Sequence, residues 1–396
     1  MSADDTPAEA ALRAEVRAWM EVHAAPYGPA TGHIRLIDTD EFAAVGRRWQ
    51  RTLDEGGWSV PTWPVELGGR GFSSNEARIV REEETRYAVP AGLFQVASLM
   101  VGPTLMACGT PGQQARFLPA IRRGEHLWCQ LFSEPDAGSD LASLRTRAER
   151  DGDEWVVTGQ KVWTSGAASA DWAILLARTD PGSRRHQGIT YFLCDMRSPG
   201  VEVRPLVQIN RAAHFNEVHL DEVRLPADAV VGEVGEGWGV VRVTLGAERA
   251  MIGSMHVGDH IADLLDVARE NGRAGDPTVR QDLVDLHIRG TVLRYLGDRV
   301  LTAVRTGGTV GPEASTIKLG LSMFMGRMGE VATRVLDGEG LLEGGDPAAT
   351  DHASYGRLQD MFLGQWSSRI GGGTEQMQRN MIGERALGLP RDPRPT

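Results

Sequence analysis

The chain of 396 residues is long enough for two or three domains. Hydrophobic residues make up 41% and charged residues 24% of it, a balance that is typical of globular proteins and excludes wholesale disorder. With 53 acidic and 42 basic residues the net charge is −11, which argues against nucleic acid or a membrane surface as a partner. Cys108, Cys129 and Cys194 lie too far apart for a disulfide framework or a metal-binding CxxC pair. Because no signal-like or membrane-spanning stretch is present, we expect a cytoplasmic protein.

Helical periodicity dominates the first third of the chain. In Glu41–Gly57 apolar residues recur every three to four positions and a glycine pair ends the pattern, which predicts a helix. Asn75–Tyr87, which follows two serines, and the shorter Gly112–Arg122 also predict helices. The stretch between Pro61 and Gly71, which contains WPVELGG, is a loop by composition.

The periodicity changes to that of strands between about residues 127 and 232. Arg145–Glu149 and Glu154–Thr158 flank Asp151-Gly152, a pair that is typical of a two-residue hairpin turn. Four further short, β-branched stretches are Trp172–Ala177, Ile189–Asp195, Val201–Leu206 and Val218–Leu225. No helical stretch separates these segments, so we expect an antiparallel barrel or sandwich and not βαβ units.

Helical patterns return in the last part of the chain. They cover Trp238–Asn271, Val279–Thr306, Ala314–Leu336 and an amphipathic run after Ile370–Thr374. The order along the chain is therefore all-α, all-β and all-α. The expected domains are an N-terminal helical domain in residues 1–125, a middle β domain in 126–235 and a C-terminal helical bundle in 236–396.

Two polar segments of the β region are candidates for a binding site. QLFSEPDAGSD (Gln130–Asp140) offers main-chain N–H groups and hydroxyls that suit an anionic or heteroaromatic ligand, or it is an ordinary strand exit with Asx turns. In GQKVWTSG, Trp163 suits the face of a flat cofactor ring while Thr164 and Ser165 bond to its edge. The alternative is that Trp163 is a core residue beside a polar turn.

Two helical segments offer other chemistry. Glu248 precedes an arginine in the otherwise apolar helix Gly239–Gly253, where burial favours a general-base role unless the two charges form an ion pair. Further on, three glycines precede Thr374, a natural helix N-cap, and such a helix start suits a phosphate. His256 and His260 are spaced like zinc ligands but lack a third partner, so we expect no metal.

Taken in order, these segments resemble the acyl-CoA dehydrogenase family over nearly the whole chain. The resemblance rests on the α–β–α order, the WPVELGG loop, QLFSEPDAGSD, GQKVWTSG, the AER segment and the terminal GGGTEQMQRNMIGERALGLP. GEHLWCQLFSEPDAGSD and RIGGGT are similar to the actinobacterial branch that acts on steroid side chains and other bulky acyl-CoAs. The resemblance implies an N-terminal helical domain, a middle antiparallel β-barrel, a C-terminal four-helix bundle and FAD as the cofactor.

The resemblance also implies which residues form the cofactor and substrate sites. The implied FAD contacts are Phe132, Ser133, Gly138, Ser139, Trp163, Thr164, Ser165, Gln281, Gly338, Gly373, Thr374 and Gln376. The implied substrate contacts are Ser139, Arg249 and Gly372. In the family, part of each FAD site comes from a neighbouring subunit, and Gln281 and the turn Leu336–Gly340 match that contribution.

Three positions depart from the common pattern of the family. The glutamate that most members use as the base is replaced by Gly372. A minority of members place the base directly before the helix arginine, where this chain has Glu248, so the resemblance implies Glu248 as the catalytic residue. The aspartate that usually stands three residues before that arginine is Gly246, which weakens the implied contact with pantetheine.

A fourth departure concerns the assembly. The arginine with which a neighbouring subunit contacts the FAD pyrophosphate aligns with Glu270. Arg269 or Arg273 replaces it, or the contact comes from a different partner chain. We therefore expect a homo-oligomer or a heterotetramer with a paralogous chain.

The implied reaction is α,β-desaturation of an acyl-CoA thioester. Glu248 takes the α-proton while a hydride passes from the β-carbon to flavin N5. Hydrogen bonds to the thioester carbonyl, one of them from the main-chain N–H of Gly372, acidify the α-carbon. An electron-transfer flavoprotein then accepts the electrons. Two alternatives are a flavin monooxygenase on the same fold and a non-catalytic subunit of a mixed tetramer.

Overall fold

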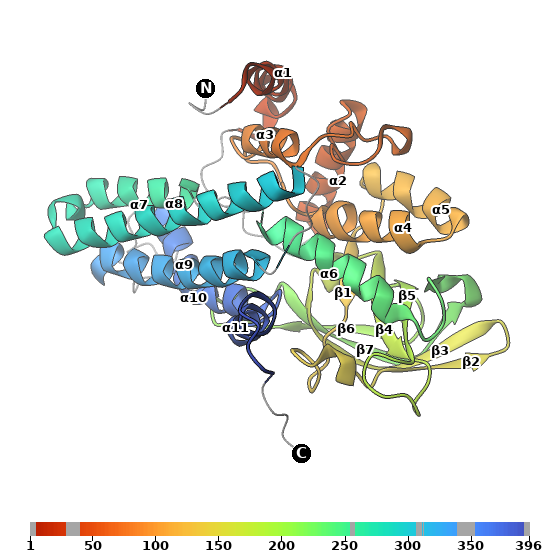
Figure 1. Cartoon of the computed structure of the whole chain (residues 1–396). Helices are drawn as coiled ribbons and strands as arrows, with labels where there is room; N and C mark the ends of the chain where they lie inside the picture. Colours follow the sequence, from red (N-terminus) through yellow and green to blue (C-terminus); the bar gives the residue numbers. More distant parts are fainter. Residues whose placement is uncertain are drawn as a thin grey trace. The chain divides into compact units, whose positions relative to one another are not determined.

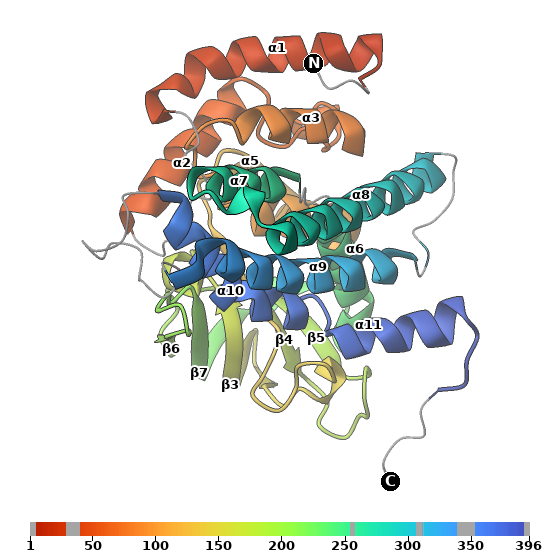
Figure 2. The same cartoon turned by 90° about the vertical axis from the view of Figure 1, so that its left-hand side faces the viewer.

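The computed structural model describes residues 5–28, 40–253, 258–305, 311, 313–338 and 353–391 (Figures 1 and 2). The chain forms two compact units. The first contains the N-terminal helices, the β-sheet and the following helix as far as Glu248, and the second contains the helices from Arg249 onward. The domain boundaries expected near residues 125 and 235 stay predictions. None of the described helices is both long and apolar enough to cross a membrane.

The helices of the first unit begin with strong local signals. They are α1 (Pro7–His23), α2 (Asp40–Glu55), α3 (Ser74–Glu84), α4 (Gly102–Cys108) and α5 (Pro111–Arg122). Thr6, Ser73 and Thr110 form capping boxes at the starts of α1, α3 and α5, so the first free N–H groups of these helices are bonded locally. The three helices expected in this region from periodicity are confirmed as α2, α3 and α5.

The β-sheet follows α5. Its strands are β1 (Trp128–Leu131), β2 (Arg147–Asp151), β3 (Glu154–Ser165), β4 (Trp172–Arg178), β5 (Ile189–Asp195), β6 (Val201–Leu206), β7 (Phe215–Pro226) and β8 (Val230–Val231). They are ordered β6-β7-β3-β2-β4-β5-β8, and β1 pairs with β4. Every strand expected from the sequence is present.

Two details of the sheet differ from expectation. The hairpin between β2 and β3 turns at Gly152-Asp153, one residue later than expected, because Asp151 still pairs with Glu154 and Gly152 takes the positive φ (59°) that opens the turn. The sheet is also not wholly antiparallel, since β1 runs parallel to β4. The β2–β3 hairpin supplies the long connection that parallel neighbours require, without a crossover helix.

The sheet separates two hydrophobic cores. Along β4, Ala173, Leu175 and Ala177 face a core made mostly of sheet residues, whereas Ile174 and Leu176 face a core shared with helices. Helix α6 (Gly237–Gly253) joins this second core, together with α4 and α5 (Figure 1). β4 is therefore buried on both faces, which explains its unbroken apolar sequence.

The second unit is a bundle of helices. Its elements are α7 (Gly258–Glu270), α8 (Pro277–Arg305), α9 (Glu313–Leu336), α10 (Ala353–Ile370) and α11 (Glu375–Met381). Helix α9 packs against both α8 and α10, and α7 completes the packing (Figure 2). The shared core includes Leu264, Leu286, Phe324 and Val331. Buried Asp282 of α8 pairs with Arg327 and Arg334 of α9, at 2.5 Å each, so an ion pair also joins these helices.

The helices of this region differ in two places from those expected. Helix α10 was not expected, because its apolar positions are interrupted by glycine, serine and glutamine. Within the helical run expected over Trp238–Asn271, the described residues form helices α6, as far as Gly253, and α7, from Gly258. Residues 254–257 lie outside the described part of the chain.

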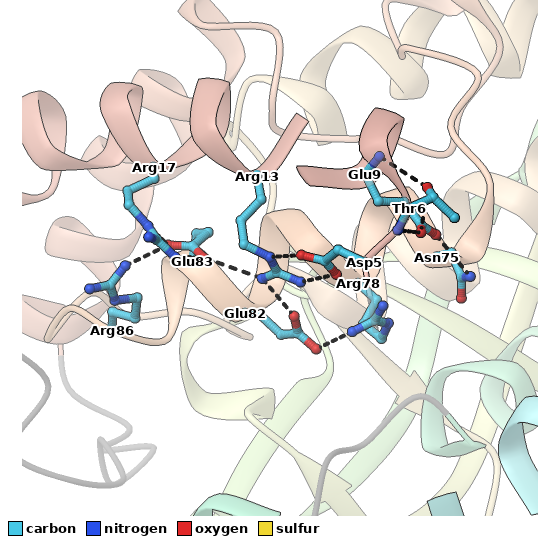
Figure 3. A network of polar contacts seen from close by, with 10 residues as sticks. All are labelled: Asp5, Thr6, Glu9, Arg13, Arg17, Asn75, Arg78, Glu82, Glu83 and Arg86. Carbon is cyan, nitrogen blue, oxygen red and sulfur yellow. Dashed lines mark hydrogen bonds and ion pairs between the residues drawn. The ribbon is translucent and has the colours of Figure 1, made fainter. Parts of the chain in front are cut away.

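An ion-pair network ties α1 to α3 (Figure 3). The Glu83 carboxylate, 3% exposed, accepts hydrogen bonds from Arg13 and Arg17 of α1 and from Arg86. Arg13 in turn pairs with Asp5 at 2.6 Å. Burial by itself would raise the pKa of Glu83, but the hydrogen bonds from the three arginines outweigh burial and lower that pKa to about 2.

Substitution of Glu83 tests how far this network holds α1. We expect Glu83→Gln to lower the opening free energy of α1 by about 2 kcal/mol at pH 7, roughly a thirtyfold faster amide exchange, because three arginines lose their anion. A carboxyl group whose pKa is lowered by folding stabilises the folded state at pH values above its pKa in the unfolded chain. In the parent this contribution therefore disappears between about pH 4.5 and 2, and the variant should lack that part of the pH dependence.

The measurement is hydrogen–deuterium exchange of α1 peptides, followed by mass spectrometry. Glu15→Gln is the matched control, because Glu15 lies on the same helix but is exposed and, among the described residues, pairs with Arg70 alone. Equal protection of α1 in the parent and in Glu83→Gln would show that hydrophobic packing alone holds the helix.

Candidate active site

The end of β3 carries the expected polar–aromatic segment on a bulge. The pairing with β7 shifts between Lys161 and Thr164, where three steps on β3 oppose two on β7. Within this bulge Trp163 has a positive φ (61°). Its indole is 63% exposed, and its ring makes an edge contact with Phe215. The alternative of a core tryptophan is therefore wrong. The bulge turns the ring to the surface of the first unit.

The second expected segment lies beside this bulge. The N–H of Val162 donates to the carbonyl of Ser133 at 2.9 Å, so the loop that follows β1 lies along the end of β3. The ring of Phe132 is buried edge-on against Tyr191, and a contact from Phe132 to a ligand would have to come from its main chain. Gly138 and Ser139 are exposed further along the same loop. The structure thus brings together the two segments that the sequence proposed separately.

Several hydroxyls in this region lack partners. Within the described residues, the side chains of Ser133, Ser139 and Ser165 make no hydrogen bond, and the buried Thr164 Oγ1 has no partner either. A flat heteroaromatic ligand with donors and acceptors along its edge would satisfy the accessible hydroxyls of Ser133, Ser139 and Ser165 while its face lies on Trp163, whereas Thr164 Oγ1 is buried beneath them. The residues present therefore fit a flavin.

A buried ion pair lies directly behind the two segments. Lys161 Nζ donates to Glu134 Oε1 at 2.8 Å and to the carbonyl of Phe132 at 3.1 Å. Burial lowers the pKa of Lys161 to about 8, against the opposing effect of Glu134. For Glu134, burial acts upward, but Lys161 and main-chain N–H groups outweigh it and lower the pKa.

Helix α6 is anchored by buried hydroxyls one turn before Glu248. Thr244 Oγ1 lies 2.9 Å from Thr104 Oγ1 of α4 and 3.1 Å from the hydroxyl of Tyr191 on β5. Since Thr244 and Glu248 are four residues apart, they share one face of the helix. Glu248 itself is half-buried. The side chain of Arg249 lies outside the described part of the chain.

The glycine-rich turn before α11 has the geometry that its sequence predicts. Gly372 and Gly373 have φ values of 65° and 92°, which side chains rarely tolerate. Thr374 is confirmed as the N-cap, because its hydroxyl accepts the N–H of Met377 at 3.1 Å. No described residue accepts the N–H of Gly372, whereas its carbonyl accepts from Gln378. Gln376 is exposed on the first turn of α11.

The remaining expected contacts lie at the other end of α9. Gln281 is exposed in the first turns of α8, next to the Asp282–Arg334 pair, and Gly338 follows the C-terminal end of α9. The turn before α11, in contrast, adjoins the start of α9, where Lys318 donates to the carbonyl of Ser368 at 2.6 Å. The stretch of chain from Lys318 to Gly338, most of it helix α9, is about 30 Å long. The second unit therefore carries two separate groups of expected FAD contacts.

Arg273 lies in the group with Gln281 and Gly338. Its guanidinium pairs with Asp337 at 3.1 Å, directly before Gly338, and its Nε is buried without a described partner. Arg269 points elsewhere along α7 and pairs with Asp266 at 3.1 Å. Of the two arginines expected to replace the one missing at Glu270, Arg273 thus has the better position.

Sequence reasoning missed Lys161 and Glu134 although both lie inside the quoted motifs. A signal was present: Trp155, Val157, Gly159 and Lys161 alternate along β3 and so share its inward face. A charge on that face must be paired. In the described residues no group of three or more potential metal ligands occurs. The side chains of His256 and His260 lie outside those residues.

Comparison with known proteins agrees with this architecture. Sequence models of the acyl-CoA dehydrogenase N-terminal, middle and C-terminal domains match residues 6–125, 129–223 and 235–387. Acyl-CoA dehydrogenase IpdE1 of Mycobacterium tuberculosis is 39% identical over 96% of this chain and 98% of that protein. Acyl-CoA dehydrogenase FadE34 of the same species is 42% identical over 86% of this chain, which spans only 46% of that longer protein.

Solved structures show the same similarity. A protein described as the Tcur3481-Tcur3483 steroid ACAD superposes with a TM-score of 0.84 at 31% identity, over 99% of this chain and 100% of that chain. The ChsE4-ChsE5 complex from Mycobacterium tuberculosis superposes with a TM-score of 0.81 at 29% identity, over 99% and 100%. The chain belongs to the acyl-CoA dehydrogenase family of oxidoreductases.

Proposed function

We propose that the chain is an FAD-dependent acyl-CoA dehydrogenase that introduces an α,β double bond into an acyl-CoA thioester. The observation that carries the proposal is the site at the end of β3. There Trp163 stands out from a strained bulge, beside the accessible hydroxyls of Ser133 and Ser165, which find no partner in the described residues. An exposed aromatic face with unpaired hydroxyls around it suits an isoalloxazine ring. Membership of the family supports this assignment.

The residues of the chain then supply binding and proton transfer. Glu248 acts as the base that takes the α-proton, and FAD, when bound, accepts the hydride from the β-carbon. Thr104, Thr244 and Tyr191 hold the helix of Glu248 against α4 and β5, which limits how far the carboxylate can move. Thr374 and Gln376 are proposed FAD contacts of the second unit.

The α-carbon also needs acidification, because a carboxylate cannot ionise an unactivated C–H bond. We assign this role to hydrogen bonds on the thioester carbonyl, one of them from the main-chain N–H of Gly372. This N–H has no acceptor in the described part of the chain. Gly372 has a positive φ, and any side chain at this position is strained. A glutamate therefore cannot simply be introduced at position 372 to restore the base that most family members carry there.

The relatives support a proposal for the substrate class. A solved relative is described as a steroid ACAD, and the IpdE1 and FadE34 relatives are mycobacterial acyl-CoA dehydrogenases. We propose a bulky acyl-CoA, such as a steroid-derived one, as the substrate. An electron-transfer flavoprotein is the proposed electron acceptor, and the cytoplasm the proposed compartment.

The two groups of expected contacts in the second unit support a shared FAD site. Arg273 and Gly338 lie about 30 Å along α9 from Lys318, near the turn at Gly372–Thr374, too far to contact one flavin ring together with it. Gln281 lies next to Asp282, whose partner Arg334 is about 24 Å along α9 from Lys318. We propose that the first group reaches the FAD of another subunit. The other subunit is a second copy or a paralogous chain; the solved ChsE4-ChsE5 structure is a complex of two named components.

The first test is flavin reduction by candidate substrates. The purified protein should be yellow and release free FAD on denaturation, because no covalent link is expected. Anaerobic addition of acyl-CoAs, from short-chain to steroidal, should bleach the flavin absorbance, fastest with bulky acyl groups. Protein that takes up no FAD, alone or with a paralogous chain, would refute the proposed cofactor. A flavin that no acyl-CoA bleaches would refute the dehydrogenase assignment.

The second test addresses the base. Glu248→Gln keeps the shape of the side chain but cannot accept a proton, so we expect FAD and acyl-CoA to bind while single-turnover flavin reduction slows about a thousandfold. Glu233→Gln, which removes an exposed carboxylate shortly before α6, is the control and should reduce flavin at the parent rate. If Glu248→Gln reduces flavin as fast as the parent, Glu248 is not the base.

A further inference from the structure

Lys161 and Glu134 form a buried ion pair between the two segments that carry the proposed flavin contacts. Lys161 is 0% exposed, and Glu134 is also buried. Each lies one or two residues from a proposed contact: Glu134 follows Ser133, and Lys161 precedes Trp163. We propose that this ion pair positions the flavin-binding backbone by holding the loop after β1 against the bulge of β3. The proposal rests on the proposed function, since it assumes that these segments bind FAD.

The partners of the pair are mostly main-chain atoms. Glu134 accepts the N–H groups of Arg145 and Thr146, at 2.6 and 2.9 Å. Lys161 donates to the carbonyl of Phe132 at 3.1 Å. The pair thus joins three stretches of backbone: the loop after β1, the approach to β2, and β3 itself. A side chain that bonds to main-chain atoms fixes where the chain runs, and so fixes the residues on either side.

The bulge at Trp163 needs such support. A non-glycine residue with a φ of 61° costs free energy and persists only where the surroundings hold it in place. On the far side of the bulge, buried Asn216 donates to the carbonyl of Thr164 at 3.1 Å. On the near side, Lys161 and the bond from Val162 to Ser133 hold the strand. If the bulge relaxed to a regular strand, the side-chain alternation would shift by one residue and Trp163 would change faces.

The ion pair acts through its neighbours and not by contact. Because Lys161 is fully buried and Glu134 nearly so, neither side chain can touch a ligand on the surface that Trp163 occupies. Both groups are positioning residues. Their effect should appear in the affinity for FAD and in the spectrum of the bound flavin, because both report on the backbone that contacts it, and not only in the stability of the fold.

The experiment separates positioning from stability by changing one partner or both. Lys161→Met leaves a buried carboxylate unpaired and should destabilise the fold. Lys161→Met with Glu134→Gln removes both charges, and the introduced glutamine keeps an oxygen for one of the two main-chain N–H groups, so part of the stability should return. We expect the double variant to bind FAD at least tenfold more weakly than the parent and to show an altered visible circular dichroism of the bound flavin.

The readouts are urea unfolding, the FAD dissociation constant and the visible circular dichroism of the full-length flavoprotein. Glu83→Gln is the matched control, because it also removes the charge of a buried, ion-paired carboxylate but lies on α3; it should lose stability without weakening FAD binding. If the double variant recovers stability and binds FAD with parental affinity and spectrum, the pair only stabilises the fold and the proposal is overturned.

Two further outcomes are distinguishable. If the double variant does not fold, Glu134→Gln alone is measured in the same way, since it is isosteric and leaves Lys161 bonded to the carbonyl of Phe132. Weaker FAD binding and a changed spectrum would support the proposal, and unchanged values would overturn it. A parent protein that binds no FAD would instead refute the proposed function, whatever the variants do.

Discussion

Burial of the central strands on both faces is the constraint on which the first unit depends. β4 sends Ala173, Leu175 and Ala177 into one core and Ile174 and Leu176 into the other, so it has no face left for polar side chains. Exposed polar groups that could meet a ligand are therefore displaced to strand ends and loops. The end of β3 and the loop after β1 are such places, and they meet because β1 and β3 belong to the same sheet.

Several of the polar groups buried in the first unit connect elements of the proposed site. Lys161 and Glu134 join the loop after β1 to β3, and Tyr191 joins β5 to α6 through Thr244. The ring of Tyr191 also packs edge-on against Phe132. The proposed flavin-binding segment and the helix that carries Glu248 are thus linked through one buried tyrosine. Buried polar groups are costly unless they are paired, and here each pair bridges segments far apart in sequence.

The second unit places its proposed contacts differently. A long helix, α9, separates the turn at Gly372 from Gly338, and ion pairs at Asp282 keep α8 and α9 aligned between them. A bundle of long helices naturally exposes residues at both ends. Such an arrangement makes sense if each end serves a different ligand site, which is what an assembly with shared sites requires.

Local chemistry in the sequence determined much of this structure. Period-2 and period-3.6 patterns predicted the strands and most helices, Ser73 and Thr374 marked helix starts, and the ordered motifs identified the family. Helix α10 was not predicted, because its apolar residues recur too irregularly to indicate a helix. Local patterns do not contain long-range pairing. Examples are the parallel contact of β1 with β4 and the ion pair of Lys161 with Glu134. The burial of Phe132 beside the half-exposed Ser133 is another. These depend on residues tens of positions apart, whose meeting is decided only when both faces of the sheet are packed.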